Sequence, residues 1–444
     1  MKRFCIFLTV IILIMSVVFI SSCKEEAAEE EEVTAEEEEV TAEEEEEAAE
    51  EEEEEVVEQI TVTYWHTMGD TEEVALNGLI EIFEEQNPNI LIEATRMAYD
   101  DFKPALLTGI AGGVVPDTAR LDIIWVPEFA EIGALVALDE TMEGFDEIIA
   151  NTFPGPTSTN FWKGHYYGLP QDTNTQVLVW NRQMLEEAGL SGPPETIEEF
   201  VEDGALLSNP DEEIYSYAMG GTYFWAPAPI FYAAGGEITD PDITTATGYV
   251  NGEKSVAAFQ ALVDMYKDGS LSPLLLGGGG VGVFEGLATN KYAMIIEGPW
   301  AQPILNSDFP EFEVNFALVP RGSDVTTSSV VGGQDVVIFE GSQHKDEAMV
   351  WAKFLLSEEA QLTMGETGAI PTLSTVQGNE RLPEYYDVFM EQLKTAKARL
   401  PHPKWSEMDN AINNAYQYML RDEKTVQQAL DDAAEEINGL IAGE

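Results

Sequence analysis

The sequence predicts an α/β protein in which helices cover doubly wound sheets. Strand-like and helix-like segments alternate from Ile60 onward: residues 60–65 alternate as a strand, apolar residues then recur at helical spacing up to Asn87-Pro88, and 90–94 is the next strand. Gln176–Trp180 also has the β-branched and aromatic composition of a buried strand. This alternation predicts a mostly parallel sheet, with ligands at the carboxyl ends of its strands.

The same periodicities predict three further elements before residue 140. A helix is expected at 102–111 and a third strand from Asp122 to Trp125. A short helix should follow from Glu128 to Gly133.

The segment YGLPQDTNTQVLVWNR, residues 167–182, combines turn signals, a polar run and an apolar strand. We interpret Gln171–Thr175 as polar groups at the point where the chain passes from one compact lobe to another. On this interpretation the segment is both a hinge and a wall of a ligand site.

Residues 1–22 have the features of an export signal. Lys2 and Arg3 precede an apolar run at 4–20, and Ser21-Ser22 are small residues before Cys23. This resembles a bacterial lipoprotein leader, in which Cys23 would be lipidated. The alternative is an uncleaved membrane anchor, because the apolar run approaches the length of a spanning helix. Both interpretations leave the remainder extracytoplasmic, on the cell surface or in the periplasm, and tied to a membrane.

Residues 23–58 are predicted to be a spacer. From Lys24 to Glu58 the chain holds 22 glutamates against one lysine, a local charge of −21. Such a run cannot bury a core and repels itself, so it should be extended or partly helical and solvated. A metal-binding tract is the alternative. Both cysteines of the chain, Cys5 and Cys23, precede Lys24, so the exported domain has no disulfide.

The formal net charge of −62 excludes several functions. Without the leader (+2) and the spacer (−21), residues 59–444 still carry −43. A domain this acidic will not bind nucleic acid or an anionic bilayer non-specifically. The charge is scattered over helix-like stretches, which favours a role in solubility.

The order of several motifs resembles a known family. Ile60–Trp65, the stretch Phe83–Pro88 and the crossover-like run 167–182 are similar to family 1 of extracellular solute-binding proteins, the maltose-binding type of carbohydrate ABC importers. Glu297-Gly-Pro-Trp300 and Val331–Ile338 continue the resemblance, which covers essentially all of residues 59–444.

This resemblance implies a two-lobed periplasmic-binding-protein type II fold with a ligand cleft between the lobes. Lobe one would hold residues 59–171 plus 317–371, and lobe two 172–316 plus 372–444. A ligand that contacts both lobes would favour the closed state. The implied function is capture of a sugar or oligosaccharide for an ABC permease, by a monomer without cofactor or metal.

A sugar site needs aromatic platforms and hydrogen-bonding groups. The loop-adjacent aromatic candidates, each of which could instead be core, are Trp65, Trp125, Tyr223, Phe224, Trp225, Trp300 and Trp405. The polar candidates, which the resemblance places along the cleft, are Asp70, Glu128, Asp172, Thr173, Asn174, Gly332, Gly333 and Gln334. Asp70 could instead cap a helix. Glu297 is either a ligand carboxylate or a loop carboxylate that faces water.

Two alternatives stay open. The same fold could bind a polyamine, a metal or a peptide; the pairs Tyr166-Tyr167 and Tyr385-Tyr386 are of the kind found in ferric sites. A surface glycoside hydrolase could use Glu297 and Asp172 as its two carboxylates. We do not expect an enzyme, because no nucleophile or metal motif accompanies these residues and a hydrolase leaves the whole-chain resemblance unexplained.

Overall fold

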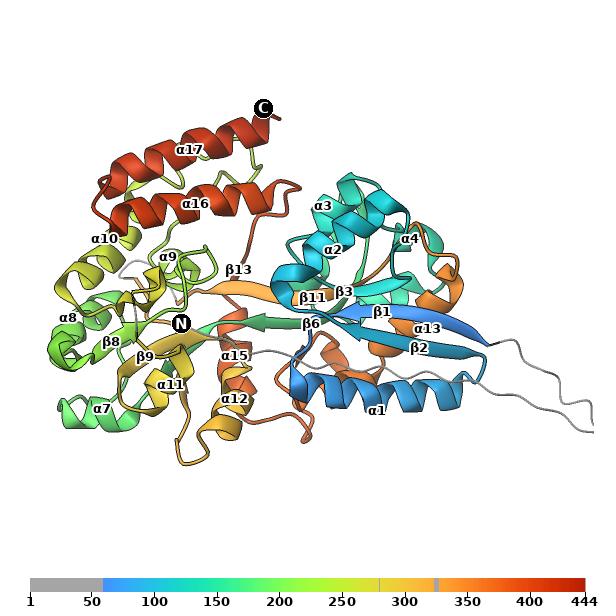
Figure 1. Ribbon diagram of the computed structural model, residues 1–444, viewed down its shortest axis with the longest axis horizontal. Helices are drawn as coiled ribbons and strands as arrows, with labels where there is room; N and C mark the ends of the chain where they lie inside the picture. The colour runs from blue at the N-terminus through green and yellow to red at the C-terminus, as the bar shows by residue number, and fades with distance from the viewer. Residues whose placement is uncertain (1–58, 279, 323–326, 444) are drawn as a thin grey trace, which may run out of the picture. The chain divides into compact units, whose positions relative to one another are not determined.

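The computed structural model describes residues 59–278, 280–322 and 327–443 (Figure 1). The predicted leader, Cys23 and the spacer lie outside the described residues. The predicted alternation is confirmed at its start, where the elements are β1 (Ile60–His66), α1 (Asp70–Gln86), β2 (Ile90–Arg96) and α2 (Tyr99–Gly112). Within the described ranges, no helix is both long and apolar enough to cross a membrane.

Helix α1 packs against the larger sheet through its apolar stripe. Leu76, Leu79 and Phe83 recur at helical spacing and are fully buried. The amino end of the helix brings Glu72 within 3.2 Å of Arg120 on the sheet. The sequence of this helix therefore also positions a carboxylate beside the sheet.

The larger sheet has the strand order β12-β6-β11-β3-β1-β2, with β13 beside β11. The further bounds are β3 Thr118–Asp122, β6 Leu169–Thr175, β11 Val330–Ile338, β12 Ile370–Pro371 and β13 Lys397–Ala398. Strands β2 and β3 run parallel to β1, but β11 is antiparallel to both β3 and β6. The prediction of a mostly parallel sheet is therefore wrong, because β6 and β11 enter from distant parts of the chain in opposing directions.

The third strand lies earlier than predicted. It is Thr118–Asp122 and not Asp122–Trp125, and helix α3 begins at Val126. Asp122 ends the strand because its Oδ1 accepts a hydrogen bond of 3.0 Å from the backbone N–H of Ile124. The apolar residues that suggested a strand are instead packed in the turn.

The polar run Gln171–Thr175 forms most of strand β6, and every residue of β6 is buried. Their backbone pairs with β11 and β12. Some of their polar side chains also have partners; for example, Thr175 donates to the carbonyl of Val330 at 2.8 Å. A strand inside the sheet can therefore consist mostly of polar residues, as β6 does. Only Gln176 separates β6 from β7, so the chain passes directly from one sheet to the other.

The smaller sheet has the order β10-β7-β9-β8. Its strands are β7 Val177–Trp180, β8 Tyr215–Ala218, β9 Tyr292–Glu297 and β10 Asn315–Ala317. Strand β7 confirms the predicted buried strand. The predicted lobe boundaries stay a prediction.

Two long C-terminal helices, α16 (Trp405–Leu420) and α17 (Val426–Ala442), lie side by side (Figure 1). They share a core with α10 (Glu253–Asp268). The remaining helices and the small hairpin strands are α3 Val126–Glu131, α4 Leu138–Thr141, α5 Phe145–Ala150, α6 Pro154–Ser158, β4 Phe161–Trp162, β5 His165–Tyr166, α7 Arg182–Glu187, α8 Ile197–Leu207, α9 Ala228–Ala233, α11 Val283–Ala288, α12 Ala301–Asp308, α13 Lys345–Leu355, α14 Glu358–Gly365 and α15 Tyr386–Leu393.

Candidate functional site

A cavity of about 660 Å³ lies between the larger sheet and segments that pack around the smaller one. On one side it is bounded by β3, β6 and β11, and on the other by the segment before α9, the loop after β9 and the start of α16. Its lining residues are Tyr99, Asp100, Asp122, Ile124, Trp125, Asn174, Tyr223, Trp225, Trp300, Gly332, Gly333, Gln334, Arg399, Ser406, Asp409 and Asn410.

Asp122, at the carboxyl end of β3, pairs with two other residues that line the cavity. Its Oδ2 accepts a hydrogen bond of 2.8 Å from the hydroxyl of Tyr99, and its Oδ1 lies 3.3 Å from Nη2 of Arg399. Asp122 and Arg399 have side chains only 9% and 8% exposed. The Nε of Arg399 is buried and has no hydrogen-bond partner among the described residues. These contacts tie β3 to α2 and to the segment after β13.

Two tryptophans form an aromatic wall opposite the larger sheet. The rings of Trp225 and Trp300 are stacked with centroids 6.4 Å apart, and the guanidinium of Arg399 lies 4.9 Å from the Trp225 ring centre. The carbonyl of Trp225 also accepts a hydrogen bond of 2.7 Å from Gln176, the single residue between β6 and β7. The wall is thus tied to the point where the chain changes sheets.

Glu297 is the hydrogen-bond partner of the Trp300 indole. Its Oε2 accepts a hydrogen bond of 3.0 Å from the indole N–H of Trp300. Burial raises the pKa of Glu297 to about 7, although this hydrogen bond acts in the opposite direction. Glu297 lies at the end of β9 and does not line the cavity. It is a partly buried support for an aromatic ring, so neither role considered from the sequence describes its position.

A second aromatic surface comes from the larger sheet's side. Trp125 is packed between Phe102 and Tyr99, with ring centroids at 6.2 and 5.0 Å. Tyr99 and Tyr223 are 46% and 50% exposed, so both present large ring area to solvent. Aromatic surfaces are therefore available from both sides of the cavity.

The glycines of β11 allow close approach of neighbouring groups. A Cβ at Gly332 would overlap the side-chain oxygen of Asn174 and the ring of Trp225. Gly333 has a φ of 137°, which side-chain-bearing residues rarely adopt, and a Cβ there would overlap the backbone of Asp172. Asn174 Oδ1 is buried in this close packing and has no hydrogen-bond partner among the described residues.

A buried ionic network lies beneath the cavity. Arg120 bonds Asp172 through Nε at 2.9 Å and Nη2 at 2.8 Å, and its Nη2 also donates to Oε1 of Gln334 at 2.7 Å. Burial raises the pKa of the Asp172 carboxyl and Arg120 lowers it, with a net upward shift. This network connects the sheet interior to Gln334 on the cavity lining.

The described residues contain no group of three or more His, Cys, Asp or Glu side chains that could hold a metal ion. Tyr385 and Tyr386 contact each other with centroids 4.9 Å apart, but neither they nor Tyr166 and Tyr167 line the cavity.

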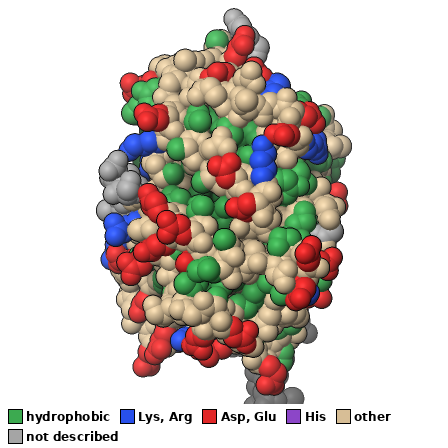
Figure 2. All heavy atoms as spheres, turned by 90° about the vertical axis from the view of Figure 1, so that its left-hand side faces the viewer, with side chains coloured by type: hydrophobic (Ala, Val, Ile, Leu, Met, Phe, Trp, Pro, Cys, Tyr) green, Lys and Arg blue, Asp and Glu red, His purple; other side chains and the backbone are tan. Residues whose placement is uncertain are grey.

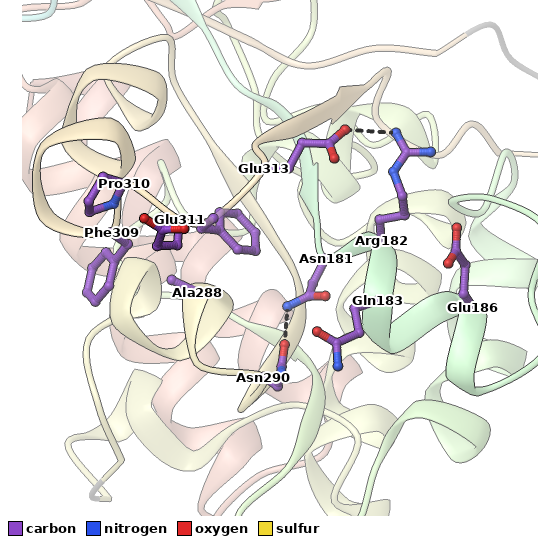
Figure 3. A pocket seen from close by; sticks show the side chains of 11 residues that line it. Asn181, Arg182, Gln183, Glu186, Ala288, Asn290, Phe309, Pro310, Glu311 and Glu313 are labelled. Carbon is purple, nitrogen blue, oxygen red and sulfur yellow. Dashed lines mark hydrogen bonds and ion pairs between the residues drawn. The ribbon is translucent and has the colours of Figure 1, made fainter.

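A second cavity of about 550 Å³ lies elsewhere on the chain (Figure 3). Asn181 donates to Asn290 at 2.7 Å, and Arg182 lies 3.4 Å from Glu313, so several of its polar groups pair with one another. Its aromatic residues, Phe309 and Phe312, carry no hydrogen-bonding group in their side chains. It is therefore a weaker candidate for a polar ligand than the tryptophan-lined cavity.

Comparison with known proteins decides the family. The model of the family described as bacterial extracellular solute-binding protein matches residues 69–362. The chain belongs to this family. The resemblance inferred from the sequence motifs is thereby confirmed, and so is the α/β fold class.

Individual members of the solute-binding family align over most of this chain. It is 24% identical over 376 residues to a maltotriose-binding protein of Pyrococcus abyssi, covering 82% of this chain and 78% of that protein. It is 23% identical over 421 residues to a periplasmic sn-glycerol-3-phosphate-binding protein of Salmonella paratyphi A, covering 86% and 92%. A solved ABC-transporter solute-binding protein of Thermotoga lettingae, bound with α-D-tagatose, has a TM-score of 0.76 at 28% identity, covering 86% and 99%.

Of the fifteen aromatic and polar candidates, Phe224 is buried in the core and eight line the cavity of this solute-binding protein. They are Trp125, Asn174, Tyr223, Trp225, Trp300, Gly332, Gly333 and Gln334. They come together because the two sheets present β6, β11 and the loop after β9 to the same space. Whether they contact a ligand stays a prediction.

The six other residues lie elsewhere. Asp70 is 91% exposed in the first turn of α1 and pairs with Arg96. Its alternative role as the helix cap is wrong as well, because the N-cap is Gly69. Glu128 lies 2.6 Å from Lys103. The remaining four are Trp65, half-buried beside the α2–β3 core, Asp172 and Thr173, both buried in β6, and Trp405, which is 1% exposed.

Trp405 shows why its loop-like sequence was misleading. It is the first residue of α16 and faces the same core as Phe224, with ring centroids 5.9 Å apart. One turn of the same helix presents Ser406, Asp409 and Asn410 to the cavity. The cavity therefore receives neighbours of the predicted tryptophan. Ser406 and Asn410 share one helix face by their i, i+4 spacing, and this face is turned away from that of Trp405.

The sequence interpretation missed eight lining residues: Tyr99, Asp100, Asp122, Ile124, Arg399, Ser406, Asp409 and Asn410. Asp122 had a usable signal, a carboxylate at the end of an apolar strand, but it was assigned to the start of the strand. Arg399 had no such signal in the sequence, because it follows β13, a two-residue strand that is recognised only by its pairing with β11.

Proposed function

We propose that this solute-binding protein captures a sugar or oligosaccharide in the cavity between its two sheets and delivers it to an ABC importer's permease. The observation that carries the proposal is the lining itself. Trp125, Trp225, Trp300, Tyr99 and Tyr223 offer aromatic surface from both sides, and polar groups lie between them. Sugars combine apolar C–H faces with a ring of hydroxyls, so they match such a lining.

The polar groups support a ligand rich in hydroxyls. The carboxylates of Asp100 and Asp409 can accept hydrogen bonds, the amides of Gln334 and Asn410 can donate and accept, and all four residues line the cavity. A hydroxyl can both donate and accept, so a sugar matches groups of both kinds.

An anionic solute, such as the glycerol phosphate of one relative, is the second candidate, but the charges oppose it. Asp100, Asp122 and Asp409 line the cavity, and Arg399 is the cation among its described lining residues. Arg399 is already paired with Asp122. The lining thus carries more negative than positive charge, which disfavours a phosphate.

One contact that joins the sides of the cavity supports ligand capture by closure. Lys103 of α2 donates to Ser406 of α16 at 2.7 Å. This contact can be made only while the two sides are close together. A ligand that binds both sides would add to it and favour the closed state, with Gln176 as a hinge point.

A glycoside hydrolase is less compatible with the positions of the two carboxylates considered for it. Asp172 is 5% exposed and bonded to Arg120, and Glu297 supports Trp300. Neither lines the cavity. We therefore propose binding without catalysis, in keeping with the family.

We also propose that the protein is exported and anchored through lipidated Cys23, with residues 24–58 as a spacer. The basic, apolar and small-residue order of residues 1–23 supports this proposal. Metabolic labelling with a radioactive fatty acid tests it. Label should enter the native chain and not the Cys23→Ser variant, whereas equal labelling of both would contradict lipidation at Cys23.

The binding proposal is tested with residues 59–444 and a panel of maltotriose, cellotriose, mannotriose, D-tagatose and sn-glycerol 3-phosphate. We expect at least one sugar to quench tryptophan fluorescence and to raise the melting temperature with its concentration, and the phosphate to do neither. Binding of the phosphate alone would overturn the sugar assignment. Release of reducing ends from any oligosaccharide would overturn a purely binding function.

A further inference from the structure

Gln334 is the lining residue whose side-chain orientation the structure determines most closely. It lies directly opposite Asp122 on β3 and opposite Asp172 on β6, so the three side chains share one face of the larger sheet. The register shifts between Gln334 and Asp335, next to the positive φ of Gly333. This bulge sets the direction of the Gln334 side chain.

The amide of Gln334 can adopt only one orientation beside Arg120. Nη2 of Arg120 lies 2.7 Å from Oε1 of Gln334, and the Arg120 side chain is 6% exposed. An arginine has donors and no acceptor, so the amide must present its oxygen to it. The Nε2 group then points away from Arg120 and makes no hydrogen bond with any described residue.

Arg120 is itself held in place. Two of its nitrogens bond Asp172, and Nη2 also lies 3.2 Å from Oε1 of Glu72 on α1. These bonds come from β6 and α1, so the guanidinium is held from two elements. A planar guanidinium held this way cannot turn to release the Gln334 oxygen without breaking several charge-assisted bonds.

We infer that Gln334 determines specificity as a hydrogen-bond donor, and that Arg120 is a positioning residue that sets this polarity. The ligand would present an acceptor oxygen to Gln334, while the lining carboxylates Asp122 and Asp409 accept from its hydroxyls. This inference rests on the proposed function, because it concerns which hydrogen-bonding groups of a sugar the same cavity recognises.

The first test replaces Gln334 in the domain of residues 59–444 and uses maltotriose, cellotriose and mannotriose as probes. Gln334→Leu should bind about tenfold more weakly than wild type, because one hydrogen bond to the ligand is lost. Gln334→Glu should bind at least as weakly as Gln334→Leu, because a carboxylate places an acceptor opposite an acceptor. Unchanged affinity of Gln334→Leu, or wild-type affinity of Gln334→Glu, would overturn the donor role.

The second test is a double-mutant cycle between Arg120→Lys and Gln334→Leu. Lysine keeps the charge beside Asp172 but loses the planar geometry. The Arg120 substitution should weaken sugar binding in wild type and have no further effect in Gln334→Leu, since Arg120 acts through Gln334. Equal losses in both backgrounds would overturn the positioning role.

A matched control separates this effect from general loss of arginine. Arg96 pairs with Asp70 and Glu73 on an exposed surface, so Arg96→Lys should leave affinity unchanged. If wild type binds none of the sugars of the binding panel, D-tagatose included, the proposed function fails and the donor role with it. If wild type binds and the cycle is additive, only the positioning role fails.

Discussion

Replacing Glu297 with glutamine should stabilise the protein at neutral and alkaline pH but not in acid. In the folded protein, burial raises the pKa of Glu297 to about 7 from an ordinary value of 4.5. The folded state therefore binds more protons than the unfolded state between these two values, and stability falls as pH rises across that window. Glutamine mimics the protonated side chain and can still accept the hydrogen bond of Trp300.

The size of the effect follows from the pKa difference. One pKa unit corresponds to about 1.4 kcal/mol, so the ionised carboxylate costs at most about 3–4 kcal/mol of folding free energy above neutral pH. The gain from Glu297→Gln should therefore be small near the ordinary glutamate pKa and approach this limit at about pH 8. Most of the gain should appear as pH rises through the interval between the two pKa values.

Urea unfolding of wild type and Glu297→Gln at a series of pH values measures this difference directly. Glu311→Gln is a control, because Glu311 is an exposed carboxylate near the same sheet; its pH profile should run parallel to that of wild type. A stability difference between Glu297→Gln and wild type that does not change with pH would refute the reasoning. It would mean that Glu297 is ionised in the folded protein at no cost.

Three other substitutions test the cavity. Trp225→Ala should weaken sugar binding by about 2 kcal/mol or more if the ring is a buried anchor; an unchanged dissociation constant with a lower melting temperature would show a packing role instead. Arg399→Met leaves Asp122 buried without its partner and should lower the free energy of unfolding by about 3–5 kcal/mol, and unchanged urea unfolding would contradict this. Gly332→Ala should cost about 1–3 kcal/mol of stability because its Cβ would overlap Asn174, and it should weaken binding; wild-type stability and affinity would argue against the close approach.

The scattered acidity predicted from the sequence is visible on one face of the protein, where Asp and Glu side chains lie among apolar and uncharged groups with few basic ones (Figure 2). None of the predictions above depends on this surface charge. The cavity differs from it because its carboxylates are held by specific partners: Asp122 by Tyr99 and Arg399, and Asp409 by the backbone N–H of Phe224 at 2.8 Å.

Local sequence predicted elements whose character is set by near neighbours. Strand β1, helix α1 and strand β7 follow from alternation, helical spacing and the Asn87-Pro88 stop, because backbone geometry repeats over a few residues. Strand β6 was missed because its polar residues are satisfied by β11, Arg120 and α14, none of which is close in sequence.

The sequence by itself determined the α/β class, the family and eight of the residues that line the cavity. Tertiary structure alone decided which face of α16 meets the cavity, placing Ser406 there and Trp405 in the core. It also decided that Asp172 forms an ion pair with Arg120, and that Arg399 pairs with Asp122, which is 277 positions away in the sequence. Periodicity identifies which residues share a face, but the partner of that face comes from distant segments, and their positions depend on how the two sheets pack.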